Sequence, residues 1–380
     1  MKKKILIVTE RRADYSKFRP IIKEIQKSKK LDYVLIVTGS HLLKEHGKTI
    51  DEIKNDGFKI TSIFSMFKKT KNDNGAEMTR AFGRAIINLS DIIEKIKPDI
   101  VLTGFDIGAN FAASIVGAHL NIVVAHIEGG EVTGTIDESI RHATSKFAHI
   151  HFTSNSDASS RLKKMGENPK YIFTVGNTSL DGIKNIETIK KEILSKKYKI
   201  DLTKHFIVIL QHTVTSEITS IEKNFLKTIH AVKEINIPSL FIFGNADAGS
   251  KQISELLKNS KIEQYPSVPY SDYINILKHA SALVGNSSSG IIEAPFLHIP
   301  TVNIGTRQTG RLRSESIIDV NYSKNDIKKA IIQSIHDEKF LKKVKNSKSF
   351  YGKGDSAKKI VRILEQIDLN KIPIQKTMMY

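Results

Sequence analysis

Acidic side chains, histidines and glycines crowd the stretch AHIEGGEVTGTIDESIRHA, residues 125–143. Glu128 is the first acidic residue after the apolar run NIVVAHI, and the glycines that follow it allow a sharp turn. A second apolar run ends as DIVLTGFD and brings Asp106 to a comparable position. We expect Asp106, Glu128 and Asp137 to converge on one crevice. Carboxylates held close together raise each other's pKa values, which suits them to general acid–base chemistry.

Part of this cluster also has a structural interpretation. Thr135 and Glu138 have the spacing of a helix capping box, so Glu138 has a role in starting a helix. The apolar spacing predicts that this helix buries Ile136, Ile140, Ala143 and Phe147. Arg141 lies four residues after Asp137 and could pair with it. The histidines and acids lack the spacing of a zinc motif, so we expect no metal.

A second polar cluster lies in SALVGNSSSGIIEAPFLHIPTVNIG, residues 281–305. Free backbone N–H groups and the hydroxyls of Ser287 and Ser288, at the start of a helix, suit a pyrophosphate. Glu293 follows within that helix, where its carboxylate could accept hydrogen bonds from ribose. No Gly-Lys-Ser/Thr follows, which argues against ATP hydrolysis. His212 and Asn245 end two further apolar runs, and His212 is a candidate for stabilising a departing diphosphate.

The first apolar run leads into VTERRADYSKFRP, residues 8–20. It places Arg11, Arg12, Ser16 and Lys17 at the start of a helix, and a basic, hydroxyl-bearing turn at such a point is suited to an anion.

Short β-branched runs alternate with amphipathic stretches throughout the 380 residues, which predicts an α/β fold with doubly wound parallel sheets. A lysine-rich segment, residues 177–204, interrupts the alternation and is the predicted hinge. We expect a first domain over residues 1–180 and a second over 200–355. The last helix, within 356–380, is expected to pack back on the first domain. Loops at the carboxyl ends of parallel strands carry every motif above, as ligand sites in such sheets require.

The overall composition narrows the class of protein. The net charge of +19 comes from dispersed lysines without interleaved aromatic residues, so we expect a solvated basic surface and no nucleic-acid partner. No apolar run approaches the roughly 20 residues that a bilayer requires, so no membrane span is expected. The start MKKKILIV is interpreted as a first strand, because a secretory core needs roughly 7 to 15 apolar residues. The absence of cysteine fits a cytoplasmic protein.

Taken in order, the motifs RADYSK, GSHL, HIEGGEVTGTIDESIRHA, LQHTVT, NADAGS, GNSSSGIIE and NIGTRQTGR resemble the hydrolysing UDP-N-acetylglucosamine 2-epimerases of sialic-acid and related nonulosonate synthesis. The resemblance covers nearly the whole chain. It implies a GT-B fold, in which two Rossmann-like domains close over a UDP-sugar, with no metal and no nicotinamide cofactor. It also implies a homo-oligomer, either a dimer or a tetramer.

Carried over by position, the resemblance implies that Asp106, Glu128 and Asp137 are the catalytic carboxylates and that His212 assists UDP departure. UDP would leave across C1–C2 to give a 2-acetamidoglucal, and water would then add to give the free 2-epimeric sugar. The roles of the individual carboxylates stay open. The implied UDP and sugar contacts are Arg12, Ser16, Arg141, His142, Asn245, Ser287, Ser288, Glu293 and Arg307.

This sequence departs from the family pattern at two points. Relatives often have Gly-Asp-Arg at the first carboxylate, where this chain has Phe105-Asp106-Ile107, and they often have proline where Thr213 stands. The missing arginine leaves the sugar open between UDP-N-acetylglucosamine and UDP-2,4-diacetamido-2,4,6-trideoxyglucose. A GT-B glycosyltransferase and a non-catalytic UDP-sugar sensor are the alternatives from other functional classes.

Overall fold

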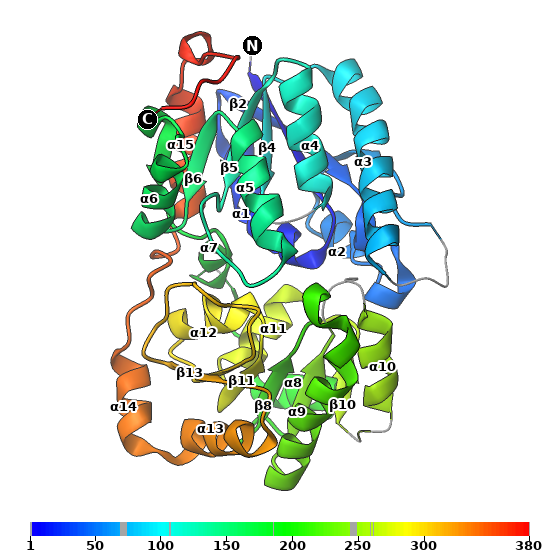
Figure 1. The fold of residues 1–380 in the computed structure, drawn as a ribbon, viewed down its shortest axis with the longest axis vertical. Helices are drawn as coiled ribbons and strands as arrows, with labels where there is room; N and C mark the ends of the chain where they lie inside the picture. The colour runs from blue at the N-terminus through cyan, green and yellow to red at the C-terminus, as the bar shows by residue number, and fades with distance from the viewer. Residues whose placement is uncertain are drawn as a thin grey trace.

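Two parallel sheets, each covered by helices, form the two halves of the molecule (Figure 1). The structure is a computed structural model that describes residues 2–68, 74–105, 108–184, 186–243, 249–258, 260 and 262–379. No helix within these ranges is long and apolar enough to cross a bilayer.

The first sheet has seven parallel strands in the order β3-β2-β1-β4-β5-β6-β7. The strands are β1 (Lys3–Thr9), β2 (Leu31–Val37), β3 (Ile60–Ile63), β4 (Ile100–Gly104), β5 (Val123–Ile127), β6 (Ile150–Thr153) and β7 (Ile172–Thr174). The helices that follow them are α1 (Arg12–Lys27), α2 (Ile50–Asn55), α3 (Gly75–Ile96), α4 (Gly108–His119), α5 (Ile136–Phe147) and α6 (Ser156–Lys164).

Successive residues along these strands point to opposite faces of the sheet, and each face forms its own hydrophobic core. Ile5 and Ile7 of β1 pack beneath α1, whereas Leu6 and Val8 pack beneath α3 and α4. Such burial on both faces explains why the strands read as continuous apolar runs.

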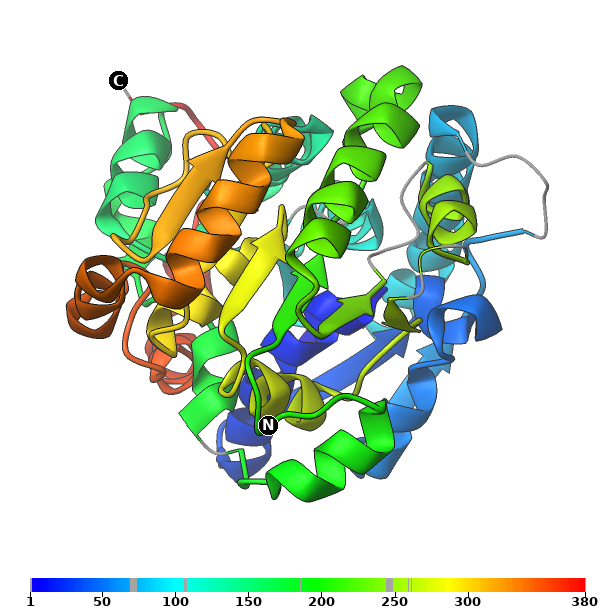
Figure 2. The ribbon, with the colours of Figure 1, turned by 90° about the horizontal axis from the view of Figure 1, so that it is seen from below.

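The second sheet has six parallel strands in the order β10-β9-β8-β11-β12-β13. They are β8 (Ile207–Leu210), β9 (Ser239–Ile242), β10 (Glu263–Tyr265), β11 (Ala282–Gly285), β12 (Thr301–Ile304) and β13 (Ile317–Val320). The helices of this half are α9 (Ile221–Ile235), α10 (Ser250–Lys258), α11 (Tyr270–Leu277), α12 (Glu293–Phe296), α13 (Lys324–His336) and α14 (Glu338–Asn346). Viewed from below, α9 and α13 lie across this sheet (Figure 2). The predicted doubly wound class is therefore confirmed, although the sequence analysis missed the short edge strands β10 and β13.

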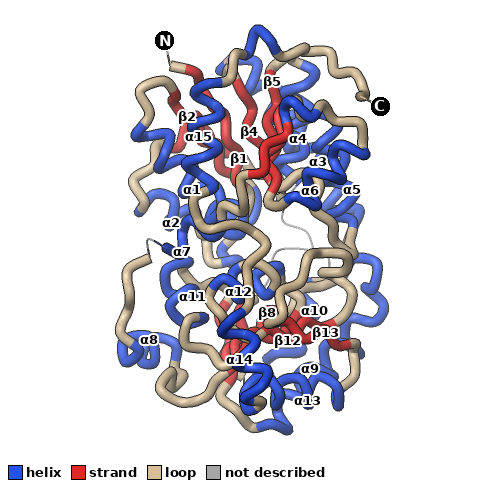
Figure 3. Tube along the Cα trace, turned by 90° about the vertical axis from the view of Figure 1, so that its left-hand side faces the viewer, coloured by secondary structure: helices blue, strands red, loops and turns tan. Residues whose placement is uncertain are grey.

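The chain crosses between the halves twice. The first crossing carries α7 (Ser179–Lys184) and α8 (Lys191–Tyr198), and the second leads from α14 to α15 (Ser356–Gln366). Apolar residues of α15, including Ile360 and Leu364, share the core of the first sheet with α1. Figure 3 shows α15 beside α1 in the upper half, separated from α14 in the lower half. The domain boundaries at residues 180, 200 and 355 stay a prediction.

The expected buried face of α5 is wrong. Ile136 is 49% exposed, and the buried residues of the helix are Arg141, Thr144 and Ser145. These polar groups are satisfied beneath the helix: Ser145 Oγ lies 3.0 Å from His126 Nδ1, for example. The helix does begin after Thr135, whose side chain accepts a hydrogen bond from Asp137 N. Glu138 instead accepts from the backbone of Thr133, so it braces the preceding loop.

Candidate active site

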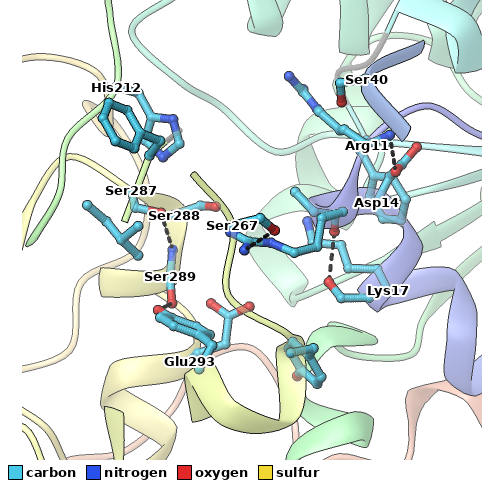
Figure 4. Close-up of a pocket in the computed structure, with 18 of the residues that line it drawn as sticks. Arg11, Asp14, Lys17, Ser40, His212, Ser267, Ser287, Ser288, Ser289 and Glu293 are labelled. Atoms are coloured by element: carbon cyan, nitrogen blue, oxygen red, sulfur yellow. Dashed lines mark hydrogen bonds between the residues drawn. The ribbon is translucent and has the colours of Figure 1, made fainter. Parts of the chain in front are cut away.

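A polar cavity of about 150 Å³ lies between the two halves, at the carboxyl ends of both sheets. We call it the interdomain cavity. The first half lines it with Arg11, Arg12, Ser16, Lys17, Phe105, Glu128 and Thr133, among others. The second half contributes, among others, Leu210, His212, Phe243, Tyr270, Tyr273, Ser287, Ser288, Ser289, Glu293, Arg307 and Arg311. Figure 4 shows the serines and His212 on one side and α1 with Lys17 on the other.

Glu128 is held by charged and neutral donors at the end of β5. Strand pairing aligns Gly104 with Ile127, so the chain leaves β4 and β5 at the same level. Glu128 is only 2% exposed, and its Oε1 lies 2.7 Å from both Lys17 Nζ and Asn177 Nδ2. A buried carboxylate requires such compensation, because burial without a partner costs several kcal/mol.

The backbone at both strand ends is unusual. Phe105 has φ +70° and Glu128 has φ +62°, the left-handed region that non-glycine residues rarely occupy. Such conformations cost about 1–3 kcal/mol and concentrate at functional sites. The Phe105 ring lies under the Lys17 ammonium, 4.5 Å from Nζ to the ring centroid. Both strained residues therefore face the same cation.

A buried carboxylate shapes the basic turn at the start of α1. Asp14 accepts hydrogen bonds from the backbone N–H groups of Glu10 and Arg11 and from the hydroxyl of Thr9. The turn projects Arg12 across the cavity, where its Nη1 donates to Val268 O at 2.7 Å and to Ser267 Oγ at 3.0 Å. Arg12 thus links the two halves.

A second link joins the glycine-rich loop of the first half to the loop after β12. Gly134 N donates to Arg307 O, and Arg311 Nε donates to Val132 O. Arg307 Nη2 lies 3.5 Å from Asp137 Oδ2. The predicted catalytic Asp137 is therefore paired with a cation of the opposite half.

The serine-rich turn, residues 286–290, joins β11 to α12 as expected. Asn286 locks it to the end of β8: its Oδ1 accepts from His212 N, and its Nδ2 donates to His212 O. Ser287 Oγ accepts a hydrogen bond from Ser289 N. Burial, and then the nearby Arg307, Arg11 and Arg12, hold the pKa of His212 well below its usual value. A neutral imidazole therefore faces the cavity.

Glu293 and two tyrosines form the floor beside the serine-rich turn. Burial raises the pKa of the Glu293 carboxyl, although Lys17 and Ser179 oppose that shift. Tyr273 hydrogen-bonds Ser289, and Tyr270 donates to Ser179 O. The arrangement presents an aromatic wall next to a carboxylate and hydroxyls.

A larger apolar groove of about 900 Å³ adjoins the interdomain cavity, and the two share Arg11, Ser40 and Thr133. Asp137 and His142 lie on its polar rim. Its apolar walls include Met66, Phe67, Met78, Phe82, Phe111, Ile136 and Ile140. The apolar side of α5 therefore faces this groove instead of the core.

One predicted site residue lies away from both cavities, and two more lie outside the described residues. Arg141 lines neither cavity; it is fully buried behind the glycine turn, where its Nη1 donates to Glu131 O. Asp106 and Asn245 lie outside the described residues. The remaining predicted residues line one of the two cavities.

From the sequence, Lys17 was expected only as part of a basic turn, and its contact with Glu128 was not predicted. Tyr273 and Arg311 were not expected to line the cavity. Lys17 and Glu128 are 111 positions apart, so only the strand order brings them together. Arg311 could have been recognised from NIGTRQTGR, which places two arginines in one loop after a strand.

Two doubly wound domains with a polar cavity between them define a GT-B-like fold. The crystal structure of UDP-GlcNAc 2-epimerase from Neisseria meningitidis, bound to UDP-GlcNAc, is similar to this structure. The TM-score is 0.80 at 22% identity, over 95% of this chain and 99% of that one. A family model described as UDP-N-acetylglucosamine 2-epimerase matches residues 23–365. The chain belongs to the UDP-N-acetylglucosamine 2-epimerase family.

Two curated relatives differ in the activity that their names give. The UDP-N,N'-diacetylbacillosamine 2-epimerase (hydrolyzing) of Legionella pneumophila is 33% identical over 100% of both chains. The UDP-N-acetylglucosamine 2-epimerase of Neisseria meningitidis serogroup B is 35% identical over 89% of each. The family is thus established, whereas the names of these two relatives give different sugars as the substrate.

Proposed function

We propose that this protein is a hydrolysing 2-epimerase that converts UDP-N-acetylglucosamine to N-acetylmannosamine and UDP. The observation that carries the proposal is the placement of Glu128, paired with Lys17, in the same cavity as the serine-rich turn. A carboxylate of one half thereby faces a candidate diphosphate cradle of the other.

In the proposed reaction, a carboxylate removes the proton from C2 while the C1–O bond to UDP breaks, leaving a 2-acetamidoglucal. Water then adds its oxygen to C1, and C2 takes a proton on the opposite face. Glu128, Asp137 and the predicted Asp106 supply the carboxylates. General acid–base groups of this kind contribute about 10²–10⁴-fold each.

The second half would bind and release UDP. The N–H groups and hydroxyls of the serine-rich turn, together with Arg307, suit the diphosphate. Tyr273 offers a face for the uracil ring, and Glu293 would accept hydrogen bonds from the ribose. His212 would donate a hydrogen bond to the departing diphosphate. A bound dianion favours protonation of this imidazole, which is neutral in the free protein.

Arg307 has two candidate partners. It pairs with Asp137 in this structure, and a diphosphate on the serine-rich turn would compete for the same guanidinium. Binding of UDP-sugar would then release Asp137 to act on the sugar.

The test is incubation of the purified protein with UDP-N-acetylglucosamine in deuterated water, followed by ¹H NMR and assay of UDP. We expect UDP and free N-acetylmannosamine in equal amounts, with deuterium at C2. UDP formation that depends on an added sugar acceptor would instead indicate a glycosyltransferase. Tight binding of the UDP-sugar without turnover would indicate a sensor.

The apolar groove favours a second candidate substrate, UDP-2,4-diacetamido-2,4,6-trideoxyglucose. This sugar replaces two hydroxyls of N-acetylglucosamine by an acetamido group and a hydrogen, and the groove beside Asp137 is lined by Met78 and Phe82. An apolar wall gains little from a hydroxyl and more from a methyl group.

The two candidate substrates can be distinguished by comparing their kcat/KM values in the wild-type protein and in Phe82→Gln. If the groove receives the sugar's far end, Phe82→Gln lowers kcat/KM for the diacetamido sugar by roughly tenfold and changes that for UDP-N-acetylglucosamine less. Equal effects on both substrates would argue against the groove as a specificity pocket.

A further inference from the structure

Asn177 holds the catalytic carboxylate without lining either cavity. It is 1% exposed, and its Nδ2 donates to Glu128 Oε1 at 2.7 Å. The other side of the carboxylate is held by Lys17, at 2.7 Å from Oε1 and 2.9 Å from Oε2. Asn177 is therefore the neutral donor of a pair that fixes the Glu128 side chain in one orientation.

The amide of Asn177 is itself fixed in orientation. Its Oδ1 accepts hydrogen bonds from the backbone N–H and the hydroxyl of Ser179, at 3.0 and 2.8 Å. An amide whose oxygen is committed to two donors must turn its NH₂ group to the opposite side, toward Glu128. The contact with Glu128 is thus enforced from the start of α7.

Asn177 also lies where the two chain crossings meet. Its backbone N–H donates to Tyr351 O of the second crossing at 2.7 Å. The neighbouring Gly176 lies so close to the second crossing that an added Cβ would come within 3.2 Å of Tyr351 O and 2.6 Å of Ser356 Oγ. One residue therefore contacts both crossings and the carboxylate.

We infer that Asn177 is a positioning residue that orients Glu128 for proton transfer from the junction of the two interdomain crossings. The inference rests on the proposed function of Glu128. Proton transfer requires a carboxylate oxygen at a defined place relative to C2, and a misplacement of about 1 Å can cost 10²-fold in rate. The role concerns the chemical step, because the diphosphate contacts lie on the other half.

The decisive variant is Asn177→Asp, measured beside Asn177→Ala and Asp181→Ala. Aspartate matches the shape of asparagine and keeps an acceptor for Ser179, but it replaces the donor by a second carboxylate. Asp181 is the matched control, since its carboxylate caps α15 at the same junction through the N–H groups of Ser356 and Ala357 without contacting Glu128.

We expect Asn177→Asp and Asn177→Ala to lower kcat by roughly ten- to a hundredfold, the effect of a lost hydrogen bond to a charged group. KM for the UDP-sugar and Kd for UDP should stay within about threefold. Asp181→Ala should lower Tm, as loss of a helix cap does, and leave kcat within about twofold of wild type.

Wild-type kcat in Asn177→Asp would overturn the inference, as would an equal loss of kcat in Asp181→Ala, which would indicate an effect through the junction's stability. A wild-type protein that releases UDP from neither sugar contradicts the proposed function, and with it the inference. That result can be told apart from an active wild-type protein with an equally active Asn177→Asp variant, which contradicts the inference alone.

Discussion

At the scale of single residues, the contact between Glu128 and Lys17 has the sharpest consequence. Both side chains are nearly buried, at 2% and 13% exposure, and they lie in the same cavity as the serine-rich turn. At this depth the attraction between the two charges is stronger than it would be at an exposed site, because the surrounding dielectric is lower.

We predict that Glu128→Gln lowers the rate of UDP release by about 10²–10⁴-fold, because glutamine cannot accept the C2 proton. Kd for UDP, measured by calorimetry, should change by less than about threefold. Glu263→Gln, an exposed change on the edge strand β10, serves as control and should retain wild-type turnover. Turnover by Glu128→Gln above a tenth of wild type would exclude Glu128 as a base or acid.

At the scale of elements, the loop after β5 does more than carry Glu128. Its backbone also contacts the loop after β12, so the two halves meet main chain to main chain at Gly134. An added Cβ at Gly134 would lie 2.2 Å from Thr306 O, a separation that forces the backbones apart.

We therefore expect Gly134→Ala to lower kcat/KM at least tenfold by holding the halves apart at the site. Gly83→Ala is the matched control, since a Cβ on that residue of α3 meets nothing within 4 Å. Alanine is favoured over glycine in a helix by about 1 kcal/mol, so Gly83→Ala should keep its activity and have a slightly higher Tm. Equal kcat/KM values for the two variants would show that the contact at Gly134 does not affect turnover.

The C-terminal segment is fastened to the first half by buried charge. Lys376 Nζ lies 2.6 Å from Glu167 Oε2, and His151 Nε2 lies 3.1 Å from the same oxygen. Burial opposes the change, but hydrogen bonds from His151 and Lys376 lower the pKa of the Glu167 carboxyl to about 2. Since the usual value is 4.5, this stabilisation is complete above pH 4.5 and is lost as the pH falls toward 2.

Glu167→Gln should accordingly lower Tm by a few degrees at pH 7.5, and the difference from wild type should shrink as the pH drops below 4.5. Differential scanning fluorimetry from about pH 2.5 to about 8 would measure it, because most of the loss falls between the usual value of 4.5 and about 2. A difference in Tm that stays constant across this range would show that the charge of Glu167 contributes nothing.

At the scale of the whole molecule, the interdomain cavity is small for the UDP group that we propose binds there, although the apolar groove adjoins it. The cavity's volume of about 150 Å³ compares with roughly 300–1,000 Å³ for typical ligand sites. We therefore expect the halves to open when a UDP-sugar enters, by hinge movement of the two crossings.

The chain contains no cysteine, so an engineered disulfide would be unambiguous. An added Cβ at Gly310 would lie 3.7 Å from Val132 Cβ, across the two halves and within the Cβ–Cβ range of a disulfide. The double variant Val132→Cys, Gly310→Cys should lose at least about 90% of its turnover when oxidised, because the halves cannot open. Dithiothreitol should restore it, and each single variant should be insensitive to oxidant. Full activity of the oxidised double variant would mean that substrate enters without opening.

Much of this architecture could be predicted from the sequence, because buried parallel strands are read as apolar, β-branched runs. The edge strand β10 was missed because it is only three residues long and partly exposed, so EQY has no such pattern. The face of α5 was assigned incorrectly because its apolar stripe lines a groove, while buried polar partners hold Arg141 and Ser145.

The lining of the interdomain cavity was predictable where a motif coincides with a loop at a strand end, as at Glu128 and Ser287. Lys17 and Asn177 were not, for different reasons. Lysine and arginine account for 59 residues of this chain, so Lys17 has no local signal to distinguish it. The role that we infer for Asn177 depends on a contact with a residue 49 positions away and on the second crossing, which joins it only in the folded molecule.

The packing of α15 on the first sheet also affects the order in which the two halves can fold during synthesis. A growing polypeptide exposes β1 and α1 to solvent long before Ile360 and Leu364 leave the ribosome. The first half is synthesised first, but the apolar surface that α15 covers stays exposed until the second half has been translated. Nascent chains arrested before residue 356 should accordingly bind chaperones that recognise exposed hydrophobic surface. Once α15 has left the ribosome and packed on the first sheet, this binding should cease.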